Sequence, residues 1–172
     1  GAIIVPLTID TEHEHEYFFE SALVDIVIKG DSITRRKHGR KCHIIETLKE
    51  KNHAGLVFFS TGTTGPPKAI LHDSTLFFKR FETPRPTYRT LSFLLFDHLG
   101  GLNTLFHTLF NKGVVVAPTS RTVDGILTDC EKYKVEVLPA TPTFLRLMLM
   151  SGTVPDKISS HLKIISYGTE AM

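Results

Sequence analysis

The chain has 172 residues, a length typical of one ordinary domain or of two small ones. Apolar residues make up 41% and charged residues 22%, proportions that indicate a folded globular protein and argue against disorder. The 20 lysines and arginines nearly balance the 18 aspartates and glutamates, which excludes the strong basic excess of a dedicated nucleic-acid binder. Two distant cysteines, Cys42 and Cys130, make neither a disulfide framework nor a Cys-x-x-Cys zinc pair. No apolar run approaches the ~20 residues of a membrane span, so we expect a cytoplasmic protein with no membrane span.

The first elements in chain order predict a strand–helix–strand unit. An apolar run over residues 3–7 predicts a strand, residues 12–23 predict a helix that Asp10 or Thr11 caps, and residues 25–29 predict a second strand. Such a βαβ unit is the building block of parallel sheets. The side chains predicted on the inner face of the helix are Tyr17, Phe18 and Leu23.

Residues 30–43 are polar and basic, with Arg35, Arg36, Lys37, Arg40 and Lys41. A contact with phosphate or nucleic acid is one interpretation of this segment. A solvated loop is favoured, because the segment has no interleaved aromatic residues and the chain has no basic excess.

Strands and helices alternate over the rest of the chain. The predicted strands cover residues 56–59, 90–95, 113–117, 136–139 and 162–166, and the predicted helices cover residues 74–81, 101–111, 123–133 and 143–150. This alternation predicts an α/β fold with layered, parallel-rich sheets flanked by helices. The Pro84-Arg-Pro-Thr87 loop predicts a boundary between a first βα portion, residues 1–83, and a second, residues 84–172.

The segment Ser60-Thr-Gly-Thr-Thr-Gly-Pro-Pro-Lys68-Ala69, which lies between two strands, carries the clearest chemistry. Glycines let the backbone approach an anion, successive amides in such a loop form an anion-binding concavity, and Lys68 adds a point charge suited to phosphate. We predict a triphosphate cradle at residues 60–69, and the alternative is a flexible, hydroxyl-rich surface loop. A P-loop NTPase is disfavoured, because Lys68 follows proline and precedes alanine, whereas the Walker motif requires Gly-Lys-Ser/Thr. The residues predicted to bind the nucleotide are Ser60, Thr61, Gly62, Thr63, Thr64, Gly65 and Lys68.

This segment resembles the phosphate-loop signature of the adenylate-forming (AMP-binding) enzymes, which include acyl-CoA synthetases, the adenylation domains of peptide synthetases, and luciferases. Ala69 departs mildly from the glycine that the family most often has there. Residues 1–7, 94–101, 137–142 and 162–170 also resemble successive segments of the same family, in the same order. The resemblance therefore implies a partial N-terminal domain of an adenylate-forming ligase.

The segment Leu94-Leu-Phe-Asp-His-Leu-Gly-Gly101 resembles the family motif that opens a helix beside the acyl pocket. The resemblance implies that His98 lies at the mouth of that pocket, as a gate or a contact for the substrate carboxylate, and that Gly100 and Gly101 border the acyl group. A plain histidine at the start of a helix is the alternative for His98. Asp97 either caps the helix that begins near Leu99 or, as in the amino-acid-activating branch, holds a substrate amine.

The last motif, Tyr167-Gly-Thr-Glu170, admits two interpretations. Its setting after a Leu-Lys-Ile-Ile strand resembles the element that lines the adenine pocket, which assigns Gly168, Thr169 and Glu170 to that wall. The second and less favoured interpretation takes it as the family's later Tyr-Gly-x-Thr-Glu motif, in which the glutamate binds magnesium.

The resemblance implies an AMP-forming acyl-CoA synthetase with Lys68 and His98 as catalytic residues, ATP, Mg²⁺ and CoA as cofactors, and a fatty or aryl carboxylic acid as substrate. The main magnesium ligand is expected outside these residues. The chain starts without methionine and ends on a loop, so we expect a fragment with both ends cut, inactive alone and without the C-terminal domain. Two other functions stay open: an adenylation domain that loads an amino acid onto a carrier protein, and a non-catalytic nucleotide-binding remnant.

Overall fold

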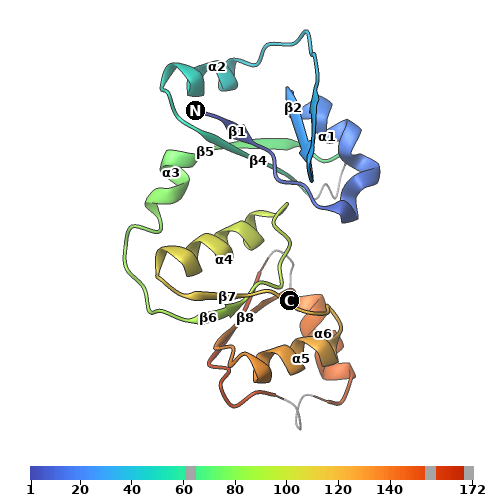
Figure 1. The fold of residues 1–172 in the computed structure, drawn as a ribbon, viewed down its shortest axis with the longest axis vertical. Helices are drawn as coiled ribbons and strands as arrows, with labels where there is room; N and C mark the ends of the chain where they lie inside the picture. The colour runs from blue at the N-terminus through green and yellow to red at the C-terminus, as the bar shows by residue number, and fades with distance from the viewer. Residues whose placement is uncertain (61–64, 154–157, 169–172) are drawn as a thin grey trace. The chain divides into compact units, whose positions relative to one another are not determined.

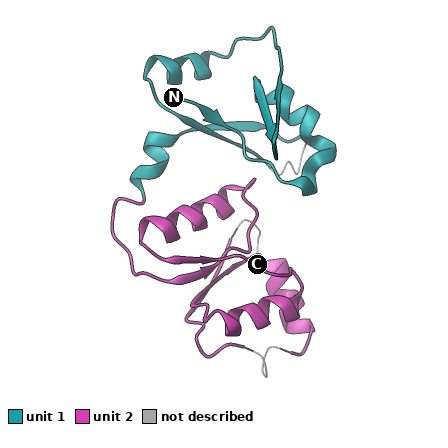
Figure 2. Cartoon of the chain, viewed as in Figure 1, with its two compact units in different colours: residues 1–80 teal, residues 81–172 magenta. Residues whose placement is uncertain are grey.

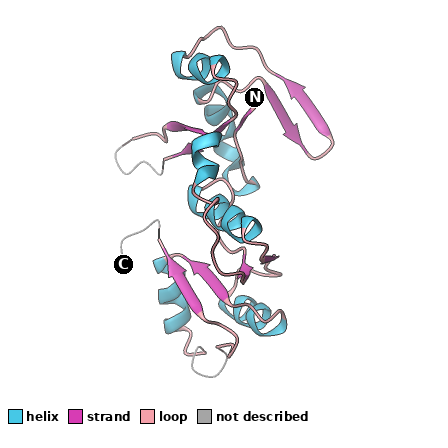
Figure 3. Ribbon diagram, turned by 90° about the vertical axis from the view of Figure 1, so that its left-hand side faces the viewer, coloured by secondary structure: helices cyan, strands magenta, loops and turns pink. Residues whose placement is uncertain are grey.

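The computed structural model describes residues 1–60, 65–153 and 158–168 of the chain. Internal contacts divide the chain into two compact parts, which we call unit 1 (residues 1–80) and unit 2 (residues 81–172; Figure 2). Each unit combines strands with flanking helices (Figure 3), and the predicted α/β fold class is confirmed.

Unit 1 is built on a mixed three-stranded sheet in the order β1-β4-β5. The central strand β4 (Gly55–Phe59) pairs in parallel with β1 (Ile3–Ile4) and antiparallel with β5 (Ala69–Asp73). The first four residues of β4 are buried, which explains its continuous apolar sequence. The helices of this unit are the 3₁₀ helix η1 (Ile9–Glu14) and the α-helices α1 (His15–Ser21), α2 (His43–Glu50) and α3 (Ser74–Lys79).

The predicted βαβ unit at the start of the chain is wrong. Strand β2 (Ile26–Lys29) pairs antiparallel with β3 (Ser32–Arg35) in a separate two-stranded sheet, and the parallel neighbour of β1 is β4. The reason is the two-residue turn after Lys29, which begins with Gly30 at a φ of +55°. A left-handed glycine in a two-residue loop turns the chain straight back into a hairpin.

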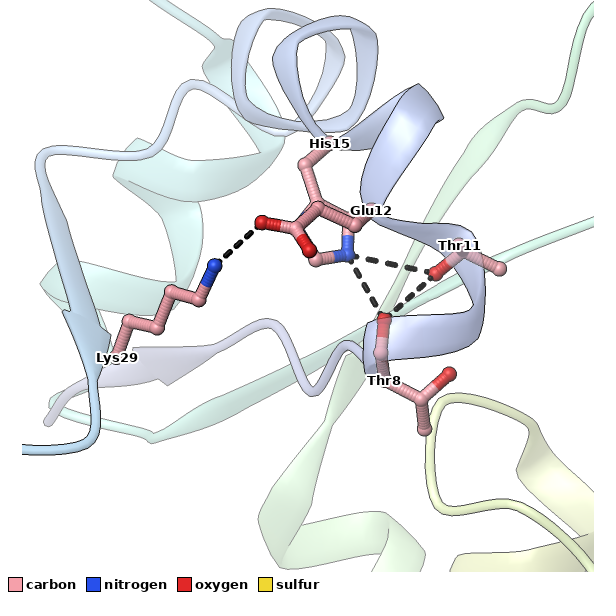
Figure 4. A network of polar contacts seen from close by, with 5 residues as sticks. All are labelled: Thr8, Thr11, Glu12, His15 and Lys29. Carbon is pink, nitrogen blue, oxygen red and sulfur yellow. Dashed lines mark hydrogen bonds and ion pairs between the residues drawn. The ribbon is translucent and has the colours of Figure 1, made fainter.

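A small polar network joins this hairpin to η1 and α1 (Figure 4). The Lys29 ammonium contacts the Glu12 carboxylate, and this hydrogen bond holds the pKa of Glu12 below its usual value. The His15 ring, with Nε2 3.0 Å from the Thr8 carbonyl oxygen and 3.4 Å from Thr11 Oγ1, ties the first turn of α1 to the start of η1. The histidine here serves local structure.

Unit 2 contains a four-stranded parallel sheet in the order β7-β6-β8-β9. Its strands are β6 (Arg89–Leu91), β7 (Val114–Val116), β8 (Val137–Ala140) and β9 (Ile164–Tyr167), and its helices are α4 (Leu99–Phe110), α5 (Val123–Lys132) and α6 (Pro142–Met150). The chain moves from β6 to β7 through α4 and returns in the opposite direction through α5 and α6. Because parallel crossovers are right-handed, α4 covers one face of the sheet and α5 and α6 cover the other, as Figure 1 shows.

The hydrophobic core of unit 2 lies between the sheet and the helices α5 and α6. Its buried members are Leu91, Phe93, Val116, Ile126, Leu127, Cys130, Val135, Leu138, Ala140, Phe144 and Met148. This packing fixes the carboxyl ends of β6 and β8.

Candidate nucleotide and acyl site

The predicted phosphate loop is the turn of the β4–β5 hairpin. The antiparallel ladder runs up to the pair Phe59 and Ala69, and one further step closes the base of the loop. The Ser60 N–H donates to the Lys68 carbonyl oxygen at 3.0 Å, and the Lys68 N–H donates to Ser60 Oγ at 3.0 Å. The Ser60 hydroxyl accepts in this arrangement, so its proton is still available to a phosphate oxygen. Thr61, Gly62, Thr63 and Thr64 lie outside the described residues.

Helix α1 supports both arms of this loop. The Phe18 ring, 4% exposed, stacks on Phe59 at the end of β4 with a centroid distance of 4.0 Å. The Tyr17 hydroxyl donates to the Pro67 carbonyl oxygen at 2.8 Å, just before Lys68. The prediction that Phe18 faces inward is therefore confirmed, whereas the same prediction for Tyr17 is wrong, because its side chain is exposed and holds the loop. Sequence reasoning missed this anchor, since 50 residues separate its partners and no spacing signals it.

Lys68 leaves the loop with an exposed side chain. Within the described residues no acidic side chain pairs with its ammonium group, and Gly65 faces open space where a Cβ would meet no atom within 4 Å. An unpaired ammonium beside a rigid Pro-Pro step and a hairpin of backbone amides suits a polyphosphate.

The far end of β5 is fixed by Asp73. Its Oδ2 lies 2.8 Å from His53 Nδ1, and its Oδ1 accepts the Thr75 N–H at 2.9 Å, which caps α3. These two hydrogen bonds, that from His53 first, hold the pKa of Asp73 below its usual value. Between Asp73 and the loop, burial and the nearby Arg80 lower the pKa of His72, which lies edge-on against Phe58. Strand β5, which begins directly after Lys68, is therefore held at both ends.

In unit 2, β6 and β8 form a topological switch point, because the chain leaves the carboxyl end of β6 in one direction and returns to β8 on its other side. Ligands in open parallel sheets bind at the carboxyl ends of such strands. Phe93, just after β6, is held there: its carbonyl oxygen accepts from Arg121 Nη1 at 2.6 Å, and its ring packs on Phe144 at 4.4 Å.

Asp97 and His98 follow this switch point and lead into α4. The Asp97 side chain is only 5% exposed, whereas that of His98 is 45% exposed, and His98 Nε2 lies 3.7 Å from Asp97 Oδ1. The N-cap position, one of the two roles expected for Asp97, falls on the next residue. Because α4 begins at Leu99, the N-cap residue is His98, and its side chain makes no capping hydrogen bond. The pair thus presents an imidazole that reaches solvent above a buried carboxyl group.

Gly101 permits a close approach of backbone to backbone at the start of α4. A Cβ at this position would lie 1.9 Å from the Leu95 carbonyl oxygen and 2.9 Å from that of Leu94. No side chain fits there. Gly100, half-buried, precedes it in the first turn of the helix. Gly101 therefore lets the segment after β6 fold tightly against its own helix.

The predicted adenine-wall segment follows the carboxyl end of β9. Gly168 is exposed, and Thr169 and Glu170 lie outside the described residues. Across the described residues, no three His, Cys, Asp or Glu side chains gather as a metal-binding group. Within the same ranges, no helix has the length and apolar character needed to cross a membrane.

The hairpin in unit 1 is suited to bind phosphate, and the parallel βα sheet in unit 2 has a topological switch point. Together they indicate an α/β nucleotide-binding protein. The sequence profile described as AMP-binding enzyme matches residues 26–172. The chain therefore belongs to the AMP-binding enzyme family, and the predicted family is confirmed. A search of curated proteins found no match.

Solved structures of family members resemble the chain. A luciferase-like enzyme from the nonluminescent mealworm Zophobas morio is 27% identical, with a TM-score of 0.58 over 70% of this chain and 29% of its own. The amide bond synthetase McbA from Marinactinospora thermotolerans is 20% identical, with a TM-score of 0.57 over 97% of this chain and 35% of its own. The N-terminal domain of FACL13 from Mycobacterium tuberculosis is 16% identical, with a TM-score of 0.55 over 68% and 31%. The chain thus spans about a third of the length of these proteins.

Proposed function

We propose that the protein containing this chain activates a carboxylic acid, fatty or aryl, at the expense of ATP and transfers the acyl group to CoA. The carboxylate oxygen attacks the α-phosphorus of ATP, the bond to the bridging oxygen breaks, and pyrophosphate leaves. The CoA thiol then forms a thioester, loses its proton, and displaces AMP from the acyl carbon. The observation that carries this proposal is the β4–β5 hairpin of a chain of this family, closed by Ser60 and Lys68, in which the Lys68 side chain is exposed and pairs with no acidic side chain among the described residues.

In the first step the protein has mainly to align reactants and neutralise charge. Negative charge accumulates on the departing pyrophosphate, where preorganised amides and an ammonium are most effective. We assign this role to residues 60–68, with Lys68 as the point charge and Ser60 as a hydroxyl donor. Thr61, Gly62, Thr63, Thr64 and Gly65 supply the remaining amides and hydroxyls under this proposal, which uses ATP as its magnesium complex and assigns magnesium no ligand among the described residues.

We assign the acyl group to the segment after β6, with His98 at the mouth of its pocket and Gly100 and Gly101 along its wall. A solvent-reaching imidazole held beside a buried carboxyl group supports a role in gating or in contact with the substrate carboxylate. Gly168, Thr169 and Glu170 are assigned to the adenine side; the supporting observation is that Gly168 directly follows the carboxyl end of β9.

A second candidate function is amino-acid activation followed by transfer to a carrier protein. The observation that favours it is the burial of Asp97, whose carboxylate would pair with a substrate amine. An acceptor assay separates the two: the full-length protein, given acid and ATP, forms a CoA thioester under the first proposal and loads a carrier-protein thiol under the second.

Pyrophosphate binding to this chain tests the hairpin directly. We expect Lys68→Ala to weaken calorimetrically measured pyrophosphate binding about tenfold, since it removes one charge-assisted contact. The matched control is Lys79→Ala, which removes an exposed lysine of the same unit from the end of α3. Equal affinities for the two variants would contradict the proposal. Because the chain spans about a third of its structural relatives, we expect it to bind weakly and to form no acyl-adenylate alone.

A further inference from the structure

A pocket opens at the amino ends of β6, β8 and β9, the edge opposite the strand ends discussed above. Its volume is about 330 Å³. The lining residues are Arg89, Lys134, Glu136, Ser160, His161 and Lys163. Arg89 begins β6, Glu136 and Lys163 precede β8 and β9, and Lys163 stands at the opposite end of β9 from Gly168.

The strand ends that frame the pocket are tied to one another by the backbone. The Glu136 N–H donates to the Arg89 carbonyl oxygen at 2.8 Å, and the Lys163 N–H donates to the Glu136 carbonyl oxygen at 2.8 Å. Lys134, in the turn between α5 and β8, has a φ of +53°, and its N–H bonds the Glu131 carbonyl oxygen at 3.2 Å. The pocket therefore rests on a fixed backbone frame.

The charges of the pocket are unequal. Three cations face one carboxylate, which leaves a net charge of +2 with His161 counted as neutral. Glu136 is already engaged, because it accepts from Lys163 Nζ at 2.5 Å and from the Arg89 N–H at 2.9 Å. Within the part of the chain that the structure describes, neither the Arg89 guanidinium nor the Lys134 ammonium forms a salt bridge with an acidic side chain. The pKa of Glu136 is held below its usual value first by the hydrogen bond from Lys163, then by that from the Arg89 N–H, and also by the charges of Lys163 and Arg89.

We infer that this pocket binds the phosphate group of a small phosphate monoester. Such a group carries a charge of about −1.5 to −2 at neutral pH, which balances the net positive charge of the side chains that line the pocket. The guanidinium of Arg89 offers a planar fork of donors to phosphate oxygens, and Lys134 offers a point charge. The volume lies at the small end of the range for small-molecule sites, so it suits a compact ligand and not a macromolecule.

The chain provides a matched control for the key lysine. Lys112 follows α4 as Lys134 follows α5: its φ is +57°, and its N–H bonds the carbonyl oxygen three residues back at 3.0 Å. Asparagine tolerates this left-handed conformation, so Lys134→Asn and Lys112→Asn each remove one cation with little backbone strain. Lys112 does not line the pocket. Lys134→Arg keeps the charge and serves as the rescue variant.

The test is a titration of the ¹⁵N-labelled chain with inorganic phosphate, and then with glycerol 3-phosphate, followed by amide NMR shifts at constant ionic strength. We expect saturable shifts at the amides of Ser160, His161 and Lys163, an affinity reduced about tenfold or more by Lys134→Asn, and affinities within about threefold of the parent chain for Lys112→Asn and Lys134→Arg. Shifts that stay linear, that are confined to the β4–β5 hairpin, or that weaken equally in both asparagine variants would overturn the inference.

Discussion

Replacing Gly101 by alanine is expected to destabilise unit 2, although alanine is the better helix former by about 1 kcal/mol. The added Cβ would lie 1.9 Å from the Leu95 carbonyl oxygen, which is 1.5 Å short of the 3.4 Å at which ordinary contact begins. The three atoms it would meet, two of Leu95 and one of Leu94, all belong to the backbone, so no side-chain rotation relieves the overlap.

The expected magnitude follows from these two opposing effects. Overpacking costs typically about 1–3 kcal/mol, and a backbone that must move as a whole places this site at the upper end. After subtraction of the gain in helix propensity, we expect Gly101→Ala to lower the free energy of unfolding by about 2 kcal/mol. For a chain of this size that corresponds to a decrease in Tm of roughly 4–8 °C.

Urea unfolding followed by far-UV circular dichroism measures the loss, and hydrogen exchange of peptides from residues 81–153 assigns it to unit 2. The control is Gly39→Ala, where an added Cβ meets nothing within 4 Å. The reasoning is refuted if Gly101→Ala is as stable as the parent chain, or if the loss of protection falls on unit 1.

Three further predictions concern single groups. Asp73→Asn keeps a capping acceptor but removes the charge beside His53. Since the pKa of Asp73 is lowered in the folded chain, the stabilisation it contributes is present above about pH 4 and disappears as the pH falls through the folded pKa. The variant's loss in urea stability is therefore expected to be largest at pH 7 and to shrink steadily as the pH is lowered below about 4. Burial raises the pKa of Cys130 to about 11, so iodoacetamide at pH 8 should alkylate Cys42 well before Cys130, as mass spectrometry would show; equal rates would contradict its placement in the core. Tyr17→Phe removes the donor that anchors the loop and should weaken pyrophosphate binding about threefold by calorimetry, whereas unchanged affinity would mean that the anchor does not organise the loop.

The helices and strands of unit 2 could be predicted because the spacing of their apolar residues in the sequence agrees with the faces that they bury. The predicted helix over residues 123–133 is α5 (Val123–Lys132), and the predicted strand over residues 113–117 contains β7 (Val114–Val116). Helix α5 buries Ile126, Leu127 and Cys130 in this core at helical spacing, so the sequence period carries the information that the fold uses, whereas β7 contributes only Val116.

The segment between residues 30 and 50 was not predictable in the same way. Strand β3 is exposed at every residue, so no apolar alternation marks it, and the loop expected there is partly a strand. Helix α2 buries only Leu48, but Ile44, Ile45 and Leu48 recur at helical spacing, so its amphipathic sequence carried a signal that our prediction missed. The charges of this segment also depend on distant partners: Arg36 Nη2 donates to Glu16 Oε2 at 2.8 Å, a pairing across 20 residues.

The candidate site, too, has features that the sequence predicts and features that depend on tertiary contacts. The loop motif ending at Lys68 and the Asp97-His98 pair were visible in the sequence, because residue type and order carry that chemistry. The support from Tyr17 and the backbone contact at Gly101 were not, because both depend on where the chain returns in space.

The most direct test of the central claim is ATP–pyrophosphate exchange, dependent on an added carboxylic acid, in the full-length protein and its Lys68→Ala variant. If the β4–β5 hairpin neutralises the leaving pyrophosphate, the full-length protein exchanges label only with acid present, and Lys68→Ala slows the exchange at least about tenfold while Lys79→Ala leaves it unchanged. An exchange rate in the Lys68→Ala variant equal to that of the parent would contradict the account.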